Sequence, residues 1–434
     1  MVSARLRELL LLLPVGLLVT AGFTAVLLTR TERIDNLSLT YGAVFLGLCV
    51  FAHFFIRARL RDADPYLFPL AALLAAFGLV MIYRIDVELA RQQAQWFVLG
   101  LALFCATVIG LRDQRSLERA RYTIAAASIV LLFLPRVPLI GAQVNGAFLA
   151  IQLGPIQFQP AEFAKIGIII FLASYLAETR DVLVRGRLPR LSLKHFGPLL
   201  VVWGAAMLLL VFIRDLGSSL MFFGGFLALL YAATSRLSLV AVGMAMFAGG
   251  AAFVASSVSH VNDRISIWLD PFRPKVVDDE GYQIAQSLFA QADGGLFGTG
   301  FGRALLELPG GGTILPAADT DLIYALIVNE LGLFGATAVV LIYLLFVARG
   351  FKAALLARDG FSKLLAAGLT AVFAMQVFVI VGGVTRVIPL TGVTLPFVSY
   401  GGSSIVANLV LLALLLIVSQ DARRDPAEAR GGLA

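Results

Sequence analysis

The sequence predicts an all-α polytopic membrane protein, and three observations support this fold class. Of the 434 residues, 59% are hydrophobic and only 14% are charged, whereas soluble domains carry about 25% charged residues. Apolar runs of about 20 residues, the length that a helix needs to cross a hydrocarbon core, recur along the chain. Because lipid offers no hydrogen-bond partner to exposed backbone, these runs are expected to be helices.

We expect about twelve transmembrane helices. The first run is too long for the apolar core of a signal peptide and lacks a clear small-residue cleavage site, so we expect it to remain as a helix. The run at 122–135 is the weakest of the set. The predicted spans are residues 8–29, 37–56, 67–83, 95–111, 122–135, 165–178, 197–213, 216–234, 238–259, 321–347, 362–388 and 403–419.

The distribution of basic residues predicts the orientation of these spans. Most of the 34 lysines and arginines lie in segments that are cytoplasmic if the N-terminus is cytoplasmic, which is the bias of inward-facing loops. The C-terminus is then also cytoplasmic, and the longest loop, 260–320, faces outward. We expect two N-terminal helices in 1–60, a core in 61–420 that includes this loop, and a cytoplasmic tail at 421–434.

Composition also excludes several classes of function. The net charge of +7 is explained by orientation and by attraction to membrane lipid, and without a clustered basic face it does not indicate nucleic-acid binding. Cys49 and Cys105 both fall in predicted spans and the three histidines are scattered, so we expect neither a disulfide framework nor a zinc site. No nucleotide-binding loop is present, so any reaction is expected to use an activated substrate from the membrane.

Four polar clusters interrupt the apolar pattern, and the predicted topology places all four at outer helix ends, where they could share one cavity. In the first, 157–165, Glu162 and Lys165 are one helical turn apart. A helix cap with a local ion pair is the alternative to a functional role. In the second, Asp215 opens a helix, and capping is there as well supported as a function.

The third cluster is the outer loop with the start of the next helix. It contains Arg264, Gln286, Ser287 and a glycine-rich run, and it ends at Asp321. A half-desolvated carboxylate at this boundary would have the raised proton affinity of a general base. A favourable partner for the helix dipole is the alternative.

Two further ionisable residues follow Asp321. Glu330 lies about nine residues deeper in the same predicted span, where an ionisable group is costly and should face the bundle interior with a partner. Arg386 is either that partner or a direct phosphate ligand, since a guanidinium matches phosphate geometry. A structural ion pair remains an alternative.

The fourth cluster, 391–404, separates the last two spans and contains Ser399, Tyr400, Gly401, Gly402 and Ser403. Non-helical backbone at membrane depth is tolerated only where it is buried in protein or lines a cavity. We therefore favour cavity lining over a simple turn.

Read in order, the motifs closely resemble those of the SEDS family of shape, elongation, division and sporulation proteins, which includes RodA, FtsW and SpoVE. The similarity covers about residues 67–420, and the first two spans resemble an extra pair that precedes the ten-helix core in some members. The motifs are Gln159-Pro160-Ala161-Glu162 with Lys165, Asp215-Leu216-Gly217, Asp270-Pro271, Gly281-Tyr282-Gln283 with Gln286-Ser287, Thr320-Asp321, Glu330-Leu331-Gly332 and Ser399-Tyr400-Gly401-Gly402-Ser403-Ser404.

The resemblance implies a peptidoglycan glycosyltransferase that polymerises lipid II at the outer face of the bacterial cytoplasmic membrane. Asp321 matches the family's essential aspartate, which would deprotonate the acceptor 4-hydroxyl; Asp319 is a competing candidate. Arg264, Lys165 and Arg386 are candidates to hold pyrophosphate, and a divalent cation, magnesium or manganese, is an additional candidate. The implied substrate-binding set is Lys165, Glu162, Asp215, Arg264, Gln286, Ser287, Glu330, Arg386, Ser399, Tyr400, Gly401, Gly402 and Ser403.

The implied protein partner is a class B penicillin-binding transpeptidase. Several positions depart from the family pattern: Phe148 and Ala150 stand where relatives tend to have Arg and Trp, and Asn329 replaces a Glu. These departures could alter activity. Leu390 favours the RodA side, although elongation and division both stay open. The rival interpretations are a flippase for a lipid-linked precursor and a non-catalytic scaffold of the elongation or division machinery.

Overall fold

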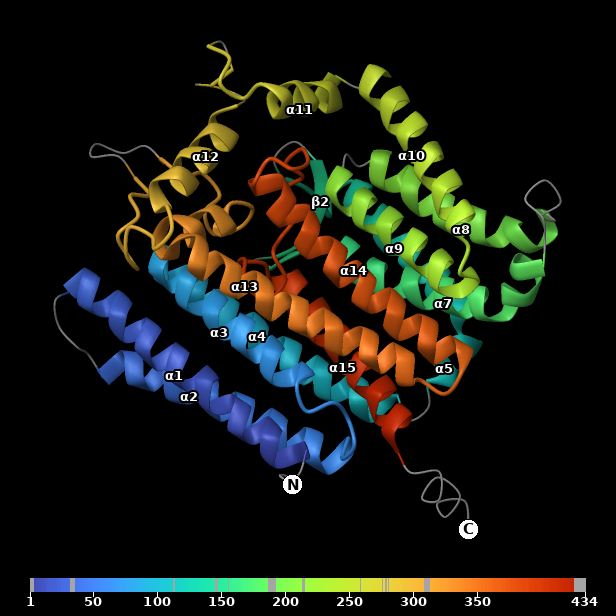
Figure 1. Cartoon of the computed structure of the whole chain (residues 1–434), viewed down its shortest axis with the longest axis horizontal. Coiled ribbons are helices and arrows are strands. Elements are labelled where there is room, and N and C mark those ends of the chain that lie inside the picture. Colours follow the sequence, from blue (N-terminus) through green and yellow to red (C-terminus); the bar gives the residue numbers. More distant parts are fainter. Residues whose placement is uncertain are drawn as a thin grey trace.

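The computed structural model describes residues 4–31, 36–111, 114–144, 147–154, 156–185, 193–212, 215–257, 259–274, 276–277, 279, 281–307 and 313–424. Within these ranges the chain forms fifteen α-helices, one short 3-10 helix and three short strands (Figure 1). Eight of the described helices are long and apolar enough to cross a membrane. The predicted helical membrane fold is confirmed, while the count of twelve spans stays a prediction. Most of the predicted tail at 421–434 lies outside the described residues.

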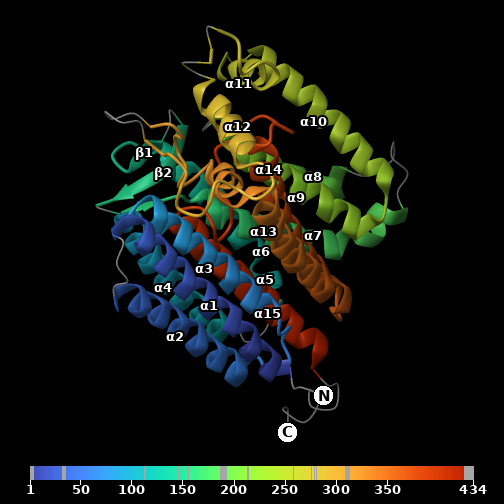
Figure 2. The same ribbon diagram turned by 60° about the vertical axis from the view of Figure 1, so that its left-hand side comes forward.

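The two N-terminal helices pack along one side of the bundle. α1 (Ala4–Thr31) contacts α2 (Asn36–Arg59) and α3 (Leu67–Ile85), and Figure 2 shows the pair beside α3 and α4 (Val87–Gly110). A buried ionic cluster fixes one end of the pair. Glu8 pairs with Arg5 and lies 2.9 Å from Nδ1 of His53, and Arg5 also donates to the carbonyl of Ala63.

The centre of the bundle is formed by α15 (Gly402–Arg423), whose residues are almost all buried. It packs against α4, α13 (Ile323–Leu356) and α7 (Ala161–Arg185), and α14 (Gly360–Val384) lies between α13, α7 and α9 (Leu216–Thr234). The polar segment between α14 and α15 therefore connects two helices of the core.

A small antiparallel sheet covers part of one end of the bundle, and the sequence did not predict it. Its order is β1 (Gly141–Val144), β2 (Ala147–Leu153) and β3 (Ile156–Phe158). The strands follow α5 (Arg115–Arg119), α6 (Arg121–Phe133) and the 3-10 turn η1 (Leu134–Arg136). Because these strands are short, they could not be recognised in a sequence dominated by apolar runs of membrane length.

The remaining helices form the flank and the cover of the bundle. α8 (Leu193–Phe212) packs on α6 and α9. α10 (Leu237–Ser257) extends past the end of the bundle to α11 (Ser259–Leu269), and α12 (Tyr282–Gly294) returns onto α13 (Figure 1). Only shorter apolar stretches, Gly197–Phe212 and Leu237–Ala252, occur in α8 and α10.

A break at Gly332 divides α13. Its φ of 68° is left-handed, and a Cβ there would lie 2.4 Å from the carbonyl oxygen of Leu296, so only glycine fits. The glycine-rich run packs into the break, where the amide of Gly300 donates to the carbonyl of Glu330 over 3.1 Å. The part after Gly332 is about 36 Å long at 1.5 Å per residue, which suffices to cross a bilayer.

This break corrects the interpretation of Glu330 as a residue deep in a continuous span at 321–347. Glu330 and Asp321 both lie before Gly332, and so before the part of α13 that is by itself long enough to cross the membrane. Both belong to the layer that the outer loop covers. The prediction that Glu330 has a buried partner is confirmed, because its side chain is 1% exposed and accepts from Nε of Arg84 over 2.9 Å. The partner is not Arg386, so that alternative is wrong.

Candidate active site

Residues 390–403, which we call the broken segment, contain most of the fourth predicted polar cluster and contact the other three. Residues 395–399 of the segment are buried, and the hydroxyl of Tyr343 on α13 donates to the carbonyl of Pro396 over 2.6 Å. It lies between the N-terminal ends of α7 and α9 and the loop that precedes α13, as the following contacts show. The other three clusters thus lie around this segment, while a cavity shared by all four stays a prediction.

The N-terminal end of α7 meets the broken segment through a chain of hydrogen bonds. Nζ of Lys165 lies 2.5 Å from Oε2 of Glu162 and donates to Oε1 of Gln376 over 2.8 Å. Nε2 of Gln376 in turn donates to the carbonyl of Thr394 over 2.9 Å. Lys165 is only 2% exposed, so the local ion pair considered as an alternative is present, and it places a positive charge beside the segment.

The N-terminal end of α9 is held by Asp215, which caps the helix as the sequence suggested. Its Oδ1 accepts from the amide of Ser218 over 2.9 Å, while Oδ2 is buried without a hydrogen-bond partner among the described residues. Burial raises the pKa of Asp215, and the nearby Glu162 raises it further. At Gly217 an added Cβ would lie 2.1 Å from Val393, so the segment touches the helix backbone.

Asp321 lies two residues before α13, with its carboxylate opposite the broken segment. A Cβ placed on Gly392 would lie 3.5 Å from its Oδ2. Within the described part of the chain the carboxylate of Asp321 has no hydrogen bond and no ion pair, and the side chain is half-buried. Burial and then the charge of Asp319 raise its pKa to about 6, against the opposing effect of Arg264.

Arg264 on α11 supplies a positive charge that acts on this carboxylate. Its Nη1 donates to the carbonyl of Leu390 over 3.2 Å. Burial lowers the pKa of Arg264, and the charges of Asp321 and Asp215 oppose this effect. Among the described residues it makes no ion pair, so the guanidinium has further donors available between two carboxylates.

A clasp formed by Ser399 and Tyr400 holds the backbone just before Asp321. The hydroxyl of Ser399 donates to the carbonyl of Thr320 over 2.7 Å and accepts from the amide of Leu395 over 2.8 Å. The amide of Tyr400 donates to the carbonyl of Asp319 over 2.8 Å. These hydrogen bonds fix the backbone at 319–320, while substrate binding by Ser399 and Tyr400 stays a prediction.

α4 contributes three residues that the sequence analysis missed. The hydroxyl of Tyr400 donates to Oε1 of Gln92 over 2.6 Å, and the amide of Gly401 donates to Oε1 of Gln93 over 3.2 Å. Gly402 packs so closely on Trp96 that a Cβ would lie 2.2 Å from its ring.

Two consecutive glutamines near the start of an apolar helix were the sequence signal that could have indicated these contacts. Ser403 completes the contacts by accepting from the amide of Gln159 over 2.8 Å.

The comparison with known proteins decides the family. The family model described as cell cycle protein, for FtsW, RodA and SpoVE, matches residues 65–424. The chain belongs to this family.

Members of the FtsW/RodA/SpoVE family resemble the chain over most of its length. The peptidoglycan glycosyltransferase RodA of Mycobacterium tuberculosis (strain ATCC 25618 / H37Rv) is 41% identical, over 97% of this chain and 92% of its own. Stage V sporulation protein E of Bacillus subtilis is 31% identical, over 85% of this chain and 100% of its own.

Solved structures of the same family share the fold. RodA of Thermus thermophilus gives a TM-score of 0.60 at 26% identity, over 84% of this chain and 98% of its own. A second structure is described as the structural coordination of polymerization and crosslinking by a peptidoglycan synthase complex. It gives a TM-score of 0.68 at 28% identity, over 84% of this chain and 99% of its own.

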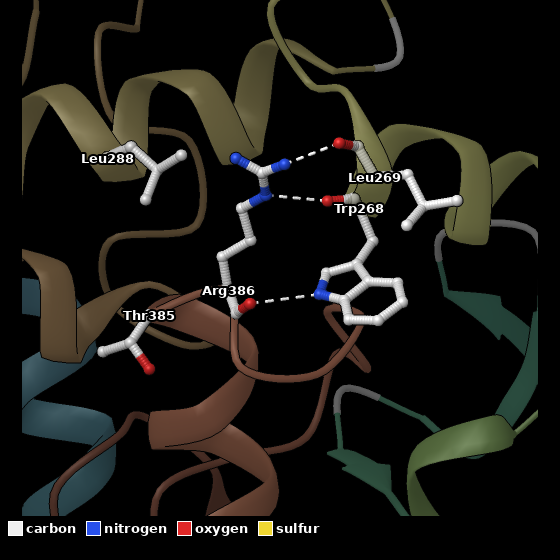
Figure 3. A pocket seen from close by; sticks show the side chains of 5 residues that line it. All are labelled: Trp268, Leu269, Leu288, Thr385 and Arg386. Carbon is white, nitrogen blue, oxygen red and sulfur yellow. Dashed lines mark hydrogen bonds between the residues drawn. The ribbon is translucent and has the colours of Figure 1, made fainter.

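Arg386, one of the residues carried over from the family, fastens the outer cover to the bundle (Figure 3). Its Nε donates to the carbonyl of Trp268 over 2.7 Å and its Nη2 to that of Leu269 over 2.6 Å, while Nε1 of Trp268 donates back to the carbonyl of Arg386 over 3.1 Å. It thus satisfies carbonyls at the end of α11. A cavity of about 500 Å³ beside it is lined by Trp268, Leu269, Leu288, Thr385 and Arg386.

Two further residues carried over from the family lie on α12. Ser287 is buried and donates to the carbonyl of Val384 at the end of α14 over 3.4 Å. Gln286 is half-buried, and its side chain has no hydrogen-bond partner within the described ranges. The described residues hold no group of three or more His, Cys, Asp or Glu side chains that could bind a metal ion.

The three family departures are each accommodated locally. Phe148 on β2 lies under the guanidinium of Arg136, with 4.2 Å between Cζ and the ring centroid, and Ala150 is buried in the same strand. Nδ2 of Asn329 donates to the carbonyl of Ala290 over 2.8 Å. Asn329 thus joins α13 to α12 as a neutral side chain beside the Glu330–Arg84 pair.

Proposed function

We propose that the chain is a peptidoglycan glycosyltransferase that polymerises lipid II, with Asp321 as the general base. The observation that carries the proposal is the carboxylate of Asp321, which is half-buried and unengaged by the described residues. Its pKa of about 6 leaves it ionised at neutral pH yet more basic than an ordinary aspartate, as a general base requires. The enzyme class is that of the RodA relatives.

In the proposed reaction, Asp321 accepts the proton of the acceptor sugar's 4-hydroxyl. The resulting oxygen nucleophile attacks the anomeric carbon of the donor, and the bond to the lipid pyrophosphate breaks. Such a base contributes about 10²–10⁴-fold to the rate. Positioning of two lipid substrates supplies much of the remainder.

The pyrophosphate that leaves carries negative charge, and Arg264 and Lys165 are the proposed groups that stabilise it. Arg264 has donors unengaged by the described residues, and Lys165 is held at the start of α7 by Glu162 and Gln376. Guanidinium groups match phosphate oxygens geometrically. Glu162, Asp215 and the residues of the clasp are proposed to shape this site around the two cations.

Asp319 is the weaker candidate for the base. Burial also raises its pKa, but Arg264, the nearby cation, interacts with Asp321 rather than with Asp319. A base beside the proposed pyrophosphate ligand can act on an acceptor placed next to the donor, which favours Asp321.

We further propose that both termini are cytoplasmic, that the site faces outward, and that a class B penicillin-binding transpeptidase is the partner. The distribution of lysine and arginine supports the orientation. The synthase complex described above, which matches in fold, supports a partner. The RodA relatives are 40–41% identical and the FtsW relatives 30–31%, which supports a role in elongation.

The test is polymerisation of labelled lipid II by the purified full-length protein, with and without the co-purified transpeptidase. Long glycan chains in either sample support the proposal. If both samples are inert and the same protein moves labelled lipid II across vesicle bilayers, the flippase interpretation replaces it. If neither activity appears in a verified complex, the chain is a scaffold.

A further inference from the structure

A second cavity, of about 650 Å³, lies where α5, α6 and α7 meet, and its lining is strongly charged. Figure 1 places α5 at the end of the bundle where α15 ends, whereas α11 and α12 cover the other end. It is thus remote from Asp321 and takes no part in the proposed glycosyl transfer. Its lining residues are Arg115, Glu118, Arg119, Arg121, Tyr122 and Glu178.

The lining of this cavity holds three arginines and two glutamates. Arg121 and Glu178 form an ion pair, and Cζ of Arg121 lies 5.0 Å from the ring centroid of Tyr122. Glu118 is the other carboxylate of the lining, and it lies on α5 together with Arg115 and Arg119. These two arginines are exposed, and being four residues apart on α5 they lie on the same face. Two guanidinium groups on one face match the oxygens of a phosphate group.

An apolar stripe on α6 begins at the edge of the cavity. Tyr122, Val130 and Phe133 are 53%, 59% and 50% exposed, and their spacing with the exposed Ala126 places them along one side of the helix. Tyrosine is enriched at the level of lipid headgroups. A soluble phosphate would use the arginines alone, whereas a phospholipid would use the arginines for its headgroup and the stripe for an acyl chain.

We propose that this cavity binds the phosphate headgroup of an anionic membrane phospholipid, with Arg115 and Arg119 as its ligands. Basic pockets between membrane helices on the cytoplasmic side favour such headgroups, and the predicted orientation places α5 on that side. The bound lipid would join α5 to α6 and α7. This inference does not depend on the proposed glycosyltransferase activity.

The test uses delipidated full-length protein, titrated with phosphatidylglycerol or phosphatidylcholine and analysed by native mass spectrometry. The double variant Arg115→Gln with Arg119→Gln is compared with Arg57→Gln with Arg59→Gln, which removes the same charge from the last turn of α2. At about 1 kcal/mol per arginine, the first variant should bind phosphatidylglycerol about thirtyfold more weakly. The second variant should bind it like the native protein, and phosphatidylcholine should bind weakly to all three.

Equal phosphatidylglycerol binding by the two double variants would overturn the proposal. So would phosphatidylcholine binding as tightly as phosphatidylglycerol. Displacement by inorganic phosphate at a comparable concentration would indicate a site for a soluble anion instead. If the glutamine variant unfolds, Arg115→Lys with Arg119→Lys keeps the charge but loses the paired donors of each guanidinium, so binding should weaken several-fold; unchanged binding would contradict the assignment.

Discussion

The hydroxyl of Ser399 donates to the carbonyl of Thr320 over 2.7 Å and so ties the broken segment to the residue that precedes Asp321. The same oxygen accepts from the amide of Leu395, which fixes its orientation. Ser399 is 3% exposed, so both bonds are shielded from water. The position of the proposed base thus depends on a segment about 80 residues further along the chain.

Replacing Ser399 with alanine should reduce polymerisation more than tenfold, because the loss of a buried partner costs about 1–3 kcal/mol and releases the backbone beside Asp321. The matched control is Ser419→Ala. Ser419 is also buried and accepts from the amide of Asp64 over 2.9 Å, but it lies at the other end of α15. Both variants should melt at lower temperature, and only Ser399→Ala should lose activity in the folded protein. Equal activity of the two would show that the clasp has no positioning role.

Asp319→Asn should move the acid limb of the pH–rate profile to lower pH. The base must be ionised, so activity should rise with pH through the pKa of Asp321, which is about 6 in the native protein. The charge of Asp319 helps to raise that pKa, and removing it lets Asp321 ionise at lower pH. The measurement is kcat/KM for lipid II between pH 4.5 and pH 8, chosen to bracket this value. An unshifted limb would mean that another group titrates.

Gln376→Leu should lower activity and stability together. This residue is fully buried and bridges the ammonium of Lys165 to the carbonyl of Thr394. Leucine fills similar space but leaves both groups without this partner, at a cost of about 1–3 kcal/mol. Gln114→Leu is the control, since Gln114 is buried at the other end of the molecule and donates to Asp421. If Gln376→Leu polymerises lipid II as well as that control does, the hydrogen-bond chain is not needed for catalysis.

Glu330 and Arg84 should behave as a structural pair rather than as substrate ligands. Arg84→Gln should destabilise the protein by about 3–5 kcal/mol, because it leaves the buried carboxylate of Glu330 without its guanidinium partner. Glu330→Gln should destabilise it less, because Arg84 is half-buried and still donates to the carbonyl of Ala304. The double variant should lose less stability than the sum of the losses of the two single variants. Thermal melting of the four proteins measures this coupling. A raised KM for lipid II with unchanged melting would instead indicate that Glu330 contacts substrate.

Sequence patterns were sufficient for the family, the helical membrane fold and the enzyme class, all of which the comparisons confirm. They were sufficient because membrane-length apolar runs and ordered polar motifs are local features. The capping role of Asp215 and the pair of Glu162 with Lys165 were among the alternatives that the sequence left open, since both depend on spacing within one helix.

Contacts between distant segments could not be obtained in this way. The partner of Glu330 is Arg84, about 250 residues earlier, and no local pattern links them. Arg386 was considered as a phosphate ligand, yet its donors satisfy the end of α11. The break at Gly332 was missed because its neighbours are apolar, and only the approach of Leu296 requires glycine there.

The most direct test of the central claim is polymerisation of labelled lipid II by native protein and by Asp321→Asn, each with its partner. The variant should be folded and should melt at the same or a higher temperature, because the native carboxylate has a pKa above that of an unfolded aspartate and its ionisation opposes folding at neutral pH. We expect long glycan chains from the native protein and none from the variant. Comparable glycan synthesis by a well-folded Asp321→Asn protein would contradict the assignment of Asp321 as the base.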